Sequence, residues 1–211
     1  SVDDTARTLF DIVLGLLVAW ILYDTKESFV TSFRLSWSTF AQTLENRVDW
    51  LESFPIGFKL NVPLTHAMGE EIQRVLQYHD QAEELLWTQE IQDAWATSLC
   101  LTATIFGFSA TIAVLMDTMW VATLHLFLLQ TFFRLMHRTQ LYLLGAVGRL
   151  FRGKKRNPLR DRTDTMEHDA MQLLLGMILC MIVVFLFTTI VVYYAFFTAV
   201  YLCVQTVALC M

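Results

Sequence analysis

The sequence predicts an all-α, polytopic membrane protein with about five transmembrane helices, one amphipathic helix and one interfacial segment. Three observations lead to this fold class. The 211 residues are 55% hydrophobic and 17% charged, with a mean hydropathy of +0.49. Several apolar runs approach or exceed the roughly 20 helical residues that cross a bilayer. The last 42 residues, 170–211, carry no charged side chain.

The first predicted span occupies residues 6–23, within an N-terminal region that we place at residues 1–23. Its eighteen residues are apolar apart from Arg7 and Asp11 near the start. Such charges are tolerated if they lie at the membrane interface or face a partner. The segment lacks the basic leader and the small-residue cleavage site of a signal peptide. We therefore expect it to be a membrane helix.

Residues 24–93 are expected to form a cytoplasmic or interfacial region. Within it, "FPIGFKLNVPL" (54–64) contains two prolines, which exclude one long regular helix. We expect an irregular segment at the membrane surface, with Trp50, Lys59 and Asn61 as interfacial residues. Residues 68–87 show apolar positions at helical spacing, opposite a mostly acidic face. An acidic face disfavours an anionic lipid surface, so this amphipathic helix should pack on protein.

Residues 94–148 are expected to form a helical hairpin. The forty residues 94–133 would be about 60 Å long as a helix, twice a hydrocarbon core of about 30 Å. The predicted turn lies near Asp117, and His125 follows eight residues later on a nearby face of the helix. These two polar residues could bind a lipid head group or a partner's charged side chain. Alternatively, Asp117 caps the second helix and His125 only packs.

The C-terminal region, residues 170–211, has two possible structures. Its length as a helix is about 63 Å, enough for two spans. A break near Thr188 and Thr189 would give a second hairpin, whereas an unbroken run would give one long helix. The sequence is compatible with both.

A basic loop is predicted at residues 149–169. Nine of the fifteen Lys and Arg residues lie between Arg134 and Arg162, so this loop should be cytoplasmic. It could merely fix the orientation of the chain, or it could bind an anionic inositol lipid or the acidic surface of a partner. The candidate binding residues are Arg152, Lys154, Lys155, Arg156, Arg160 and Arg162.

Familiar catalytic motifs are absent from the sequence. It has no G-x-G-x-x-G, no P-loop, no H-E-x-x-H, no G-x-S-x-G and no βαβ alternation. The four cysteines, Cys100, Cys180, Cys203 and Cys210, lie in apolar runs without zinc spacing. We therefore predict no catalytic residue, no metal, no cofactor and no nucleic-acid partner, and we do not expect this chain alone to be a complete nucleotide-sugar enzyme.

Three motifs carry a family resemblance. "VDWLESFPIGFKLNVPL", "LMDTMWVATLHLF" and "LFRGKKRNPLRDRTD" occur in this order, and with them residues 46–211 resemble the PIG-Q family. Residues 66–93 match that family poorly. The resemblance implies a subunit of the glycosylphosphatidylinositol N-acetylglucosaminyltransferase complex in the endoplasmic reticulum membrane. That complex transfers GlcNAc from UDP-GlcNAc to phosphatidylinositol on the cytoplasmic face, in the first step of GPI-anchor synthesis.

The resemblance also implies that catalysis and membrane anchoring belong to different subunits. In this family the sugar-transfer chemistry belongs to a separate glycosyltransferase subunit, so the chain is expected to be a membrane scaffold. Its expected partners are that catalytic subunit, other membrane subunits, phosphatidylinositol and membrane lipids. Family members are usually longer at the N-terminus, so residues from Ser1 onward should form the membrane-embedded core only.

Two other functions compete with the scaffold. A lipid transporter or scramblase would use Asp117 and His125 to line a polar path, but the other polar residues of 94–133 before Arg134 are only Thr, Ser and Gln. A membrane-embedded transferase acting alone would need a base and a donor site, and neither constellation is found.

Overall fold

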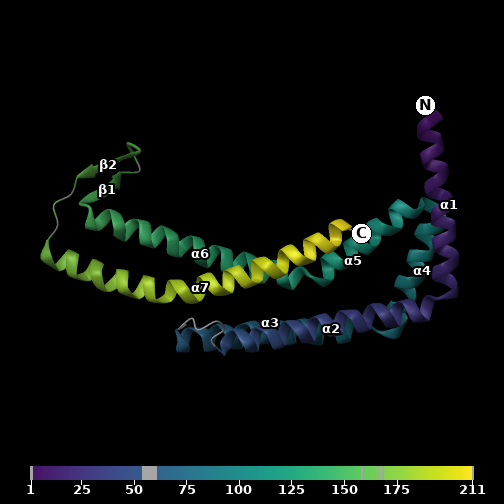
Figure 1. Cartoon of the computed structure of the whole chain (residues 1–211), viewed down its shortest axis with the longest axis horizontal. Coiled ribbons are helices and arrows are strands. Elements are labelled where there is room, and N and C mark those ends of the chain that lie inside the picture. Colours follow the sequence, from purple (N-terminus) through teal and green to yellow (C-terminus); the bar gives the residue numbers. More distant parts are fainter. Residues whose placement is uncertain (1, 54–60, 158, 166, 168, 211) are drawn as a thin grey trace. The chain divides into compact units, whose positions relative to one another are not determined.

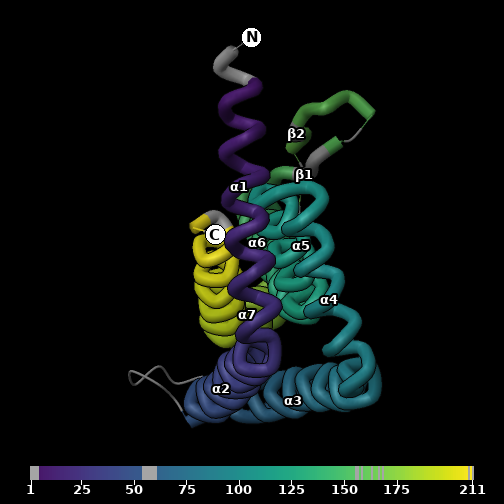
Figure 2. The backbone as a smooth tube through the Cα atoms, turned by 90° about the vertical axis from the view of Figure 1, so that its right-hand side faces the viewer, coloured from purple at the N-terminus to yellow at the C-terminus, as the bar shows by residue number. Residues whose placement is uncertain are grey.

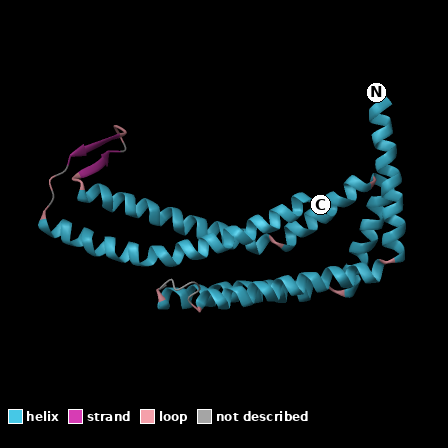
Figure 3. Cartoon of the chain, viewed as in Figure 1, coloured by secondary structure: helices cyan, strands magenta, loops and turns pink. Residues whose placement is uncertain are grey.

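The computed structural model describes residues 2–53, 61–157, 159–165, 167 and 169–210, and most of them are helical (Figure 3). The expected all-α class is confirmed, with one short β-hairpin that the sequence did not predict. In chain order the elements are α1 (Val2–Asp24), α2 (Lys26–Glu52), α3 (Val62–Leu86), α4 (Gln89–Phe106), α5 (Phe108–Ala122), α6 (Leu124–Phe151), β1 (Lys154–Asn157), β2 (Arg162–Thr165) and α7 (Ala170–Cys210), as labelled in Figure 1.

The chain divides into two compact units, each with its own packing. The first unit comprises Ser1–Ser53, Gly69–His125 and Val204–Met211. The second comprises Phe54–Met68 and Leu126–Cys203.

In the first unit, α1 packs closely against the point where α4 meets α5, and α1 and α4 lie side by side in Figure 2. Gly15 makes this approach possible. A Cβ atom there would lie 2.5 Å from the carbonyl oxygen of Ala103 and 2.6 Å from the Cα of Gly107. Small residues at a contact between apolar helices allow the backbones to approach in this way.

Gly107 separates α4 from α5. Its φ of 88° lies in a region that favours glycine, and the chain turns there instead of continuing as one helix. The side chain of Asp11, on α1, completes the start of α5 by accepting hydrogen bonds from the N–H and the hydroxyl of Ser109, at 3.0 Å and 2.7 Å. The predicted turn near Asp117 is therefore wrong, because that residue lies inside α5 and the break comes ten residues earlier.

The amphipathic helix expected at residues 68–87 is confirmed as α3, which begins six residues earlier. Ile72 and Leu76 are buried, and so are Trp37, Leu44, Val48 and Leu51 on α2. The amide of Gln73 on α3 donates to the Asp49 carboxylate on α2 over 2.6 Å. The acidic helix thus packs on protein, as predicted.

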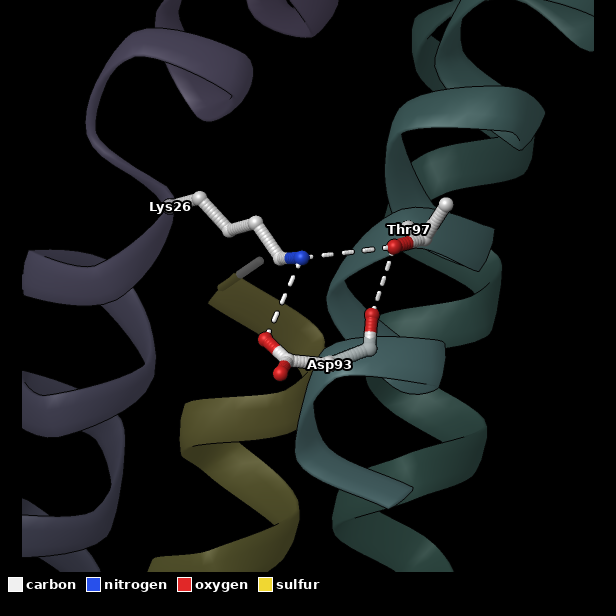
Figure 4. Close-up of polar contacts among 3 residues, drawn as sticks. All are labelled: Lys26, Asp93 and Thr97. Atoms are coloured by element: carbon white, nitrogen blue, oxygen red, sulfur yellow. Dashed lines mark hydrogen bonds and ion pairs between the residues drawn. The ribbon is translucent and has the colours of Figure 1, made fainter. Parts of the chain in front are cut away.

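A polar contact ties the start of α2 to α4. The Lys26 ammonium lies 3.2 Å from the Asp93 carboxylate and donates to the Thr97 hydroxyl over 3.4 Å (Figure 4). That hydroxyl itself donates to the backbone oxygen of Asp93 over 2.6 Å. Aromatic packing reinforces the contact, because Trp95 on α4 stacks against Phe29 of α2.

In the second unit, α6 packs on α7 through large rings. Phe133 stacks on Phe197 and on Tyr193, with ring centroids 5.0 Å and 5.6 Å apart, and all three side chains are almost fully buried. The Tyr193 hydroxyl donates to the backbone oxygen of Thr65 over 3.3 Å. α7 continues unbroken through Thr189, which is fully buried, so the C-terminal region is one long helix and not a hairpin.

Fewer helices can cross a membrane than expected. In the described part of the chain, two are long and apolar enough, at Thr5–Asp24 and Ala170–Ala208. A third span is possible if α5 and α6, which are bent by 54° at their junction, act as one. The predicted count of about five spans is not confirmed, because Gly107 divides the apolar run 94–116 and α7 remains one helix.

Candidate functional site

The basic loop forms a small β-hairpin in the second unit. Gly153, with a φ of 66°, ends α6, and its N–H donates to the Leu150 oxygen over 2.9 Å. β1 then pairs with β2 in an antiparallel register that sets Lys154 opposite Thr165 and Asn157 opposite Arg162. The sequence predicted the cluster of basic residues but not the strands that hold it.

One carboxylate organises this basic hairpin, which we define as residues 152–165. Asp164 lies 2.8 Å from the Arg162 guanidinium and accepts a hydrogen bond from the Asn157 amide over 3.1 Å. Arg152, Lys154 and Arg160 are exposed. Lys155 and Arg156 occupy β1 opposite Asp164 and Thr163, so four of the six predicted residues, Lys154, Lys155, Arg156 and Arg162, lie on the paired strands. A concentrated positive charge of this kind attracts anionic head groups and acidic protein surfaces.

Asp117 and His125 were predicted to lie on one helix, but they do not. The chain bends at Thr123, between α5 and α6, so the two residues lie on different elements. Asp117 is exposed and lines a large cavity, whereas His125 is buried. The Nδ1 atom of His125 lies 3.1 Å from the Ala122 oxygen, and its ring packs 3.8 Å from that of His79. The His125 ring thus packs on His79, and the capping role of Asp117 is wrong, because Asp117 lies inside α5. Binding of a head group or a partner by these two residues stays a prediction.

The cavity beside Asp117 lies in the first unit, between α2, α3 and α5, and has a volume of ≈ 550 Å³. Its wall is largely apolar. The lining side chains include Phe33, Trp37, Leu86, Trp87, Val114 and Val121. A cavity of this volume is in the range of about 300–1,000 Å³ that holds small ligands. We call it the apolar compartment.

A second cavity of ≈ 480 Å³ adjoins the first and is lined by α2, by α3 and by Trp87 after it. We call it the acidic compartment, because Glu45, Asp80, Glu83 and Glu84 lie in its wall. Four residues line both compartments: Arg34, Trp37, Glu83 and Trp87. The sequence did not predict this arrangement, because helical spacing shows that the acidic residues of α3 share one face of that helix but not that α2 lies beside them.

One hydrogen bond lies at the boundary between the compartments, and burial affects a carboxylate in the acidic one. The Trp37 indole N–H donates to the Glu83 carboxylate over 2.6 Å, which joins α2 to α3. Burial, followed by the carboxylates of Asp80 and Asp49, raises the pKa of Glu45 above its ordinary value. Burial is thus the main reason that this carboxylate takes up a proton more readily than a free one, and the neighbouring carboxylates add to it.

His79, Asp80 and Glu83 are the group of side chains that could hold a metal ion in the described part of the chain. One ligand atom from each lies within 4.8 Å of the others. Glu83, however, already accepts the Trp37 N–H, and His79 packs on His125. Structural contacts therefore account for two of the three side chains, and we assign no metal to them.

The predicted interfacial residues have different environments. Trp50 is 46% exposed near the end of α2, and its place at the membrane interface stays a prediction. Asn61 is half-buried: its side-chain oxygen accepts the Leu64 N–H over 3.3 Å at the start of α3, and its own N–H donates to Thr189 over 3.0 Å. Lys59 lies outside the described residues.

Comparison with known proteins agrees with the predicted resemblance. A family model described as "N-acetylglucosaminyl transferase component (Gpi1)" matches residues 2–211. The chain is 34% identical over 181 residues to the N-acetylglucosaminyl-phosphatidylinositol biosynthetic protein gpi1 of Schizosaccharomyces pombe, covering 82% of this chain and 26% of the relative. It is 29% identical over 213 residues to phosphatidylinositol N-acetylglucosaminyltransferase subunit Q of Mus musculus, covering 94% and 34%.

The chain spans about a third or less of the length of these curated relatives. No solved structure gives a significant match.

Proposed function

The chain belongs to the Gpi1 family of N-acetylglucosaminyl transferase components, and on that premise we propose that it is a non-catalytic membrane scaffold subunit of a GPI-GlcNAc transferase complex. The complex would transfer GlcNAc from UDP-GlcNAc to phosphatidylinositol, the first step of GPI-anchor synthesis. We place the chain in the endoplasmic reticulum membrane with the basic hairpin on the cytoplasmic face. The match to a relative named as subunit Q, over 94% of this chain, is the observation that carries the proposal.

The secondary structure supports a non-catalytic role. The described residues are helices and one antiparallel pair of strands. Nucleotide donors commonly bind at the carboxyl ends of a parallel sheet, beside a glycine-rich turn. In our proposal a separate subunit supplies that site, and this chain supplies apolar helices that anchor the assembly in the bilayer.

The basic hairpin is the proposed contact for the catalytic subunit or for the inositol lipid. An inositol lipid offers negative charge, as would an acidic surface of that subunit, and each basic residue near an anionic lipid surface contributes about 1 kcal/mol. The paired strands hold these charges at the end of α6 in a defined register, which favours recognition over a role in orientation alone.

Co-purification tests the scaffold role. The tagged chain would be isolated from membranes in mild detergent, and GlcNAc transfer from UDP-GlcNAc to phosphatidylinositol would be measured on the eluate and on the isolated chain. We expect activity in the complex and none in the chain alone. Product formation by the isolated chain would show that it is itself catalytic, and elution without any transferase would contradict the assignment to the complex.

Charge reversal tests the basic hairpin. We expect Lys154→Glu with Lys155→Glu and Arg156→Glu to lower transferase activity or to release the catalytic subunit. Reversal of Arg47, an exposed residue of α2, is the control and should leave both unchanged. If the hairpin variant assembles and works normally, the basic residues serve orientation only.

A further inference from the structure

The apolar and acidic compartments together form a site whose chemistry differs from that of the basic hairpin. The apolar compartment includes Val114 and Val121 of α5, an apolar helix, whereas the acidic compartment is lined by α2, α3 and the adjoining Trp87. The acidic compartment is therefore the more polar of the two, although Asp117 and Glu83 also line the apolar one. A ligand that fills both compartments should be an amphiphile.

The charges define the head group of that amphiphile. Four carboxylates and one guanidinium line the acidic compartment, a formal charge of −3. Such a wall repels an anionic head group and attracts a cation. Two indole rings, those of Trp37 and Trp87, line the same space, and aromatic faces beside carboxylates recognise ammonium groups.

Arg34 indicates where the phosphate of such a ligand would bind. It lines both compartments, and it makes no ion pair with any other described residue. Arg34 is exposed at the boundary, where the Glu83 carboxylate is already held by the Trp37 N–H, so its guanidinium is the free charge there. In a zwitterionic phospholipid the phosphate lies between the acyl chains and the ammonium group, and it would lie beside this guanidinium. Arginine binds phosphate through charge-assisted hydrogen bonds.

We propose that the double cavity binds one ammonium-bearing phospholipid, with an acyl chain in the apolar compartment, the phosphate at Arg34 and the ammonium group among Glu45, Asp80, Glu83 and Glu84. Carboxylates accept the N–H groups of a primary ammonium, as in phosphatidylethanolamine, and the indole faces also suit the quaternary ammonium of phosphatidylcholine. The site would hold a resident lipid at the edge of the membrane. The site shares no residue with the basic hairpin, so this proposal can be tested independently of the proposed scaffold function.

Photoactivatable lipids test the proposal directly. The full chain would be reconstituted in phosphatidylglycerol nanodiscs that contain one probe, an ethanolamine, choline or glycerol phospholipid with the same diazirine-bearing acyl chain. Labelled peptides would be mapped by mass spectrometry, and label on α5 would be normalised to label on α7. We expect the ethanolamine and choline probes to label α5 roughly tenfold more than the glycerol probe.

The two ammonium probes also distinguish the contacts. Stronger labelling by the ethanolamine probe would assign recognition mainly to the carboxylates, and labelling by the choline probe at the same or a higher level would assign it mainly to the indole rings. Either result supports the proposal. Equal labelling by all three probes would overturn it, because the site would then ignore head-group charge.

Substitutions locate the label within the cavity. Ala82 lines the apolar compartment and is exposed, so Ala82→Trp should fill the space and abolish selective labelling without disturbing a buried contact. Ala94→Trp, at an exposed alanine of α4 outside both compartments, should leave labelling unchanged. Unchanged labelling in Ala82→Trp, with helix content preserved in circular dichroism, would contradict the proposed site.

The charged groups are tested separately. We expect Arg34→Gln to lower labelling by both ammonium probes roughly tenfold, because the phosphate loses its charged partner. Arg47→Gln on the same helix is the control. Neutralising Asp80 and Glu84 should remove the preference over the glycerol probe, whereas neutralising Glu70 and Glu71, outside the compartments on α3, should preserve it. A preference that survives loss of Asp80 and Glu84 would argue against ammonium recognition.

Discussion

The two units join their helices in opposite ways. In the first, α1 approaches the α4–α5 junction so closely that Gly15 leaves no room for a side chain. In the second, the rings of Phe133, Tyr193 and Phe197 fill the space between α6 and α7. The first contact requires that Gly15 has no side chain, whereas the second requires the three large rings. Added atoms should therefore damage the first unit, and removed atoms should damage the second.

The largest effect is expected from Phe133→Ala. This ring is 1% exposed and stacks on two others, so its removal leaves a cavity in the α6–α7 contact. We expect a loss of about 4 kcal/mol in the free energy of unfolding. Equilibrium unfolding in mixed micelles, followed by circular dichroism, measures it. Phe132→Ala is the matched control, because that neighbour is 54% exposed and should cost much less.

Gly15→Ala is expected to have the next largest destabilising effect, by adding atoms instead of removing them. The new methyl group would overlap backbone atoms of Ala103 and Gly107, which cannot move aside as a side chain could. We expect a loss of about 2–3 kcal/mol, typical of overpacking. Gly148→Ala places the same methyl group in open space on α6 and should be neutral or slightly stabilising. Equal effects of the two substitutions would mean that α1 does not approach α4 as described.

Asp11→Ala tests the polar half of the same junction. The residue supplies from α1 the acceptor that α5 needs at its second residue, where Gly107 has no side chain to offer. Loss of a helix cap costs about 1 kcal/mol. Asp11→Asn keeps an acceptor oxygen and should retain most of the stability, as measured by the same unfolding experiment. If the asparagine variant is as unstable as the alanine variant, the carboxylate charge matters more than the cap.

The sequence predicted features that are encoded locally. The apolar run 6–23 became α1, the periodic stripe at 68–87 became α3, and the basic cluster lies in one segment, because length, spacing and charge are properties of neighbouring residues. The turn was misplaced for the opposite reason. A glycine inside an apolar run is no clear break, and its effect here depends on Asp11, some hundred residues away.

Two further features have no strong local signal. The strands β1 and β2 lack the apolar alternation that predicts strands, because most of their residues are basic or polar. The double cavity exists only where α2, α3 and α5 converge, so Trp37 and Glu83 acquire a joint role through folding. Helical spacing of Trp37, Leu44, Val48 and Leu51 could have predicted α2 but not its partner.

The smallest effect is expected from Lys26→Met, which sharpens the comparison by testing a contact that is neither a close approach nor a packed ring. The Lys26 and Asp93 side chains are 32% and 59% exposed, so solvent screens their attraction. Exposed ion pairs contribute about 0–1 kcal/mol, and we expect a loss near 0.5 kcal/mol in the free energy of unfolding.

Lys26→Arg is the control, because it keeps the charge and should retain most of the stability. Because salt weakens such pairs, the difference between the Met and Arg variants should shrink as ionic strength rises. A difference that stays constant with salt would instead assign the effect of Lys26 to its aliphatic stem, and the start of α2 would then be held to α4 by apolar packing, as in the ring contacts of the second unit.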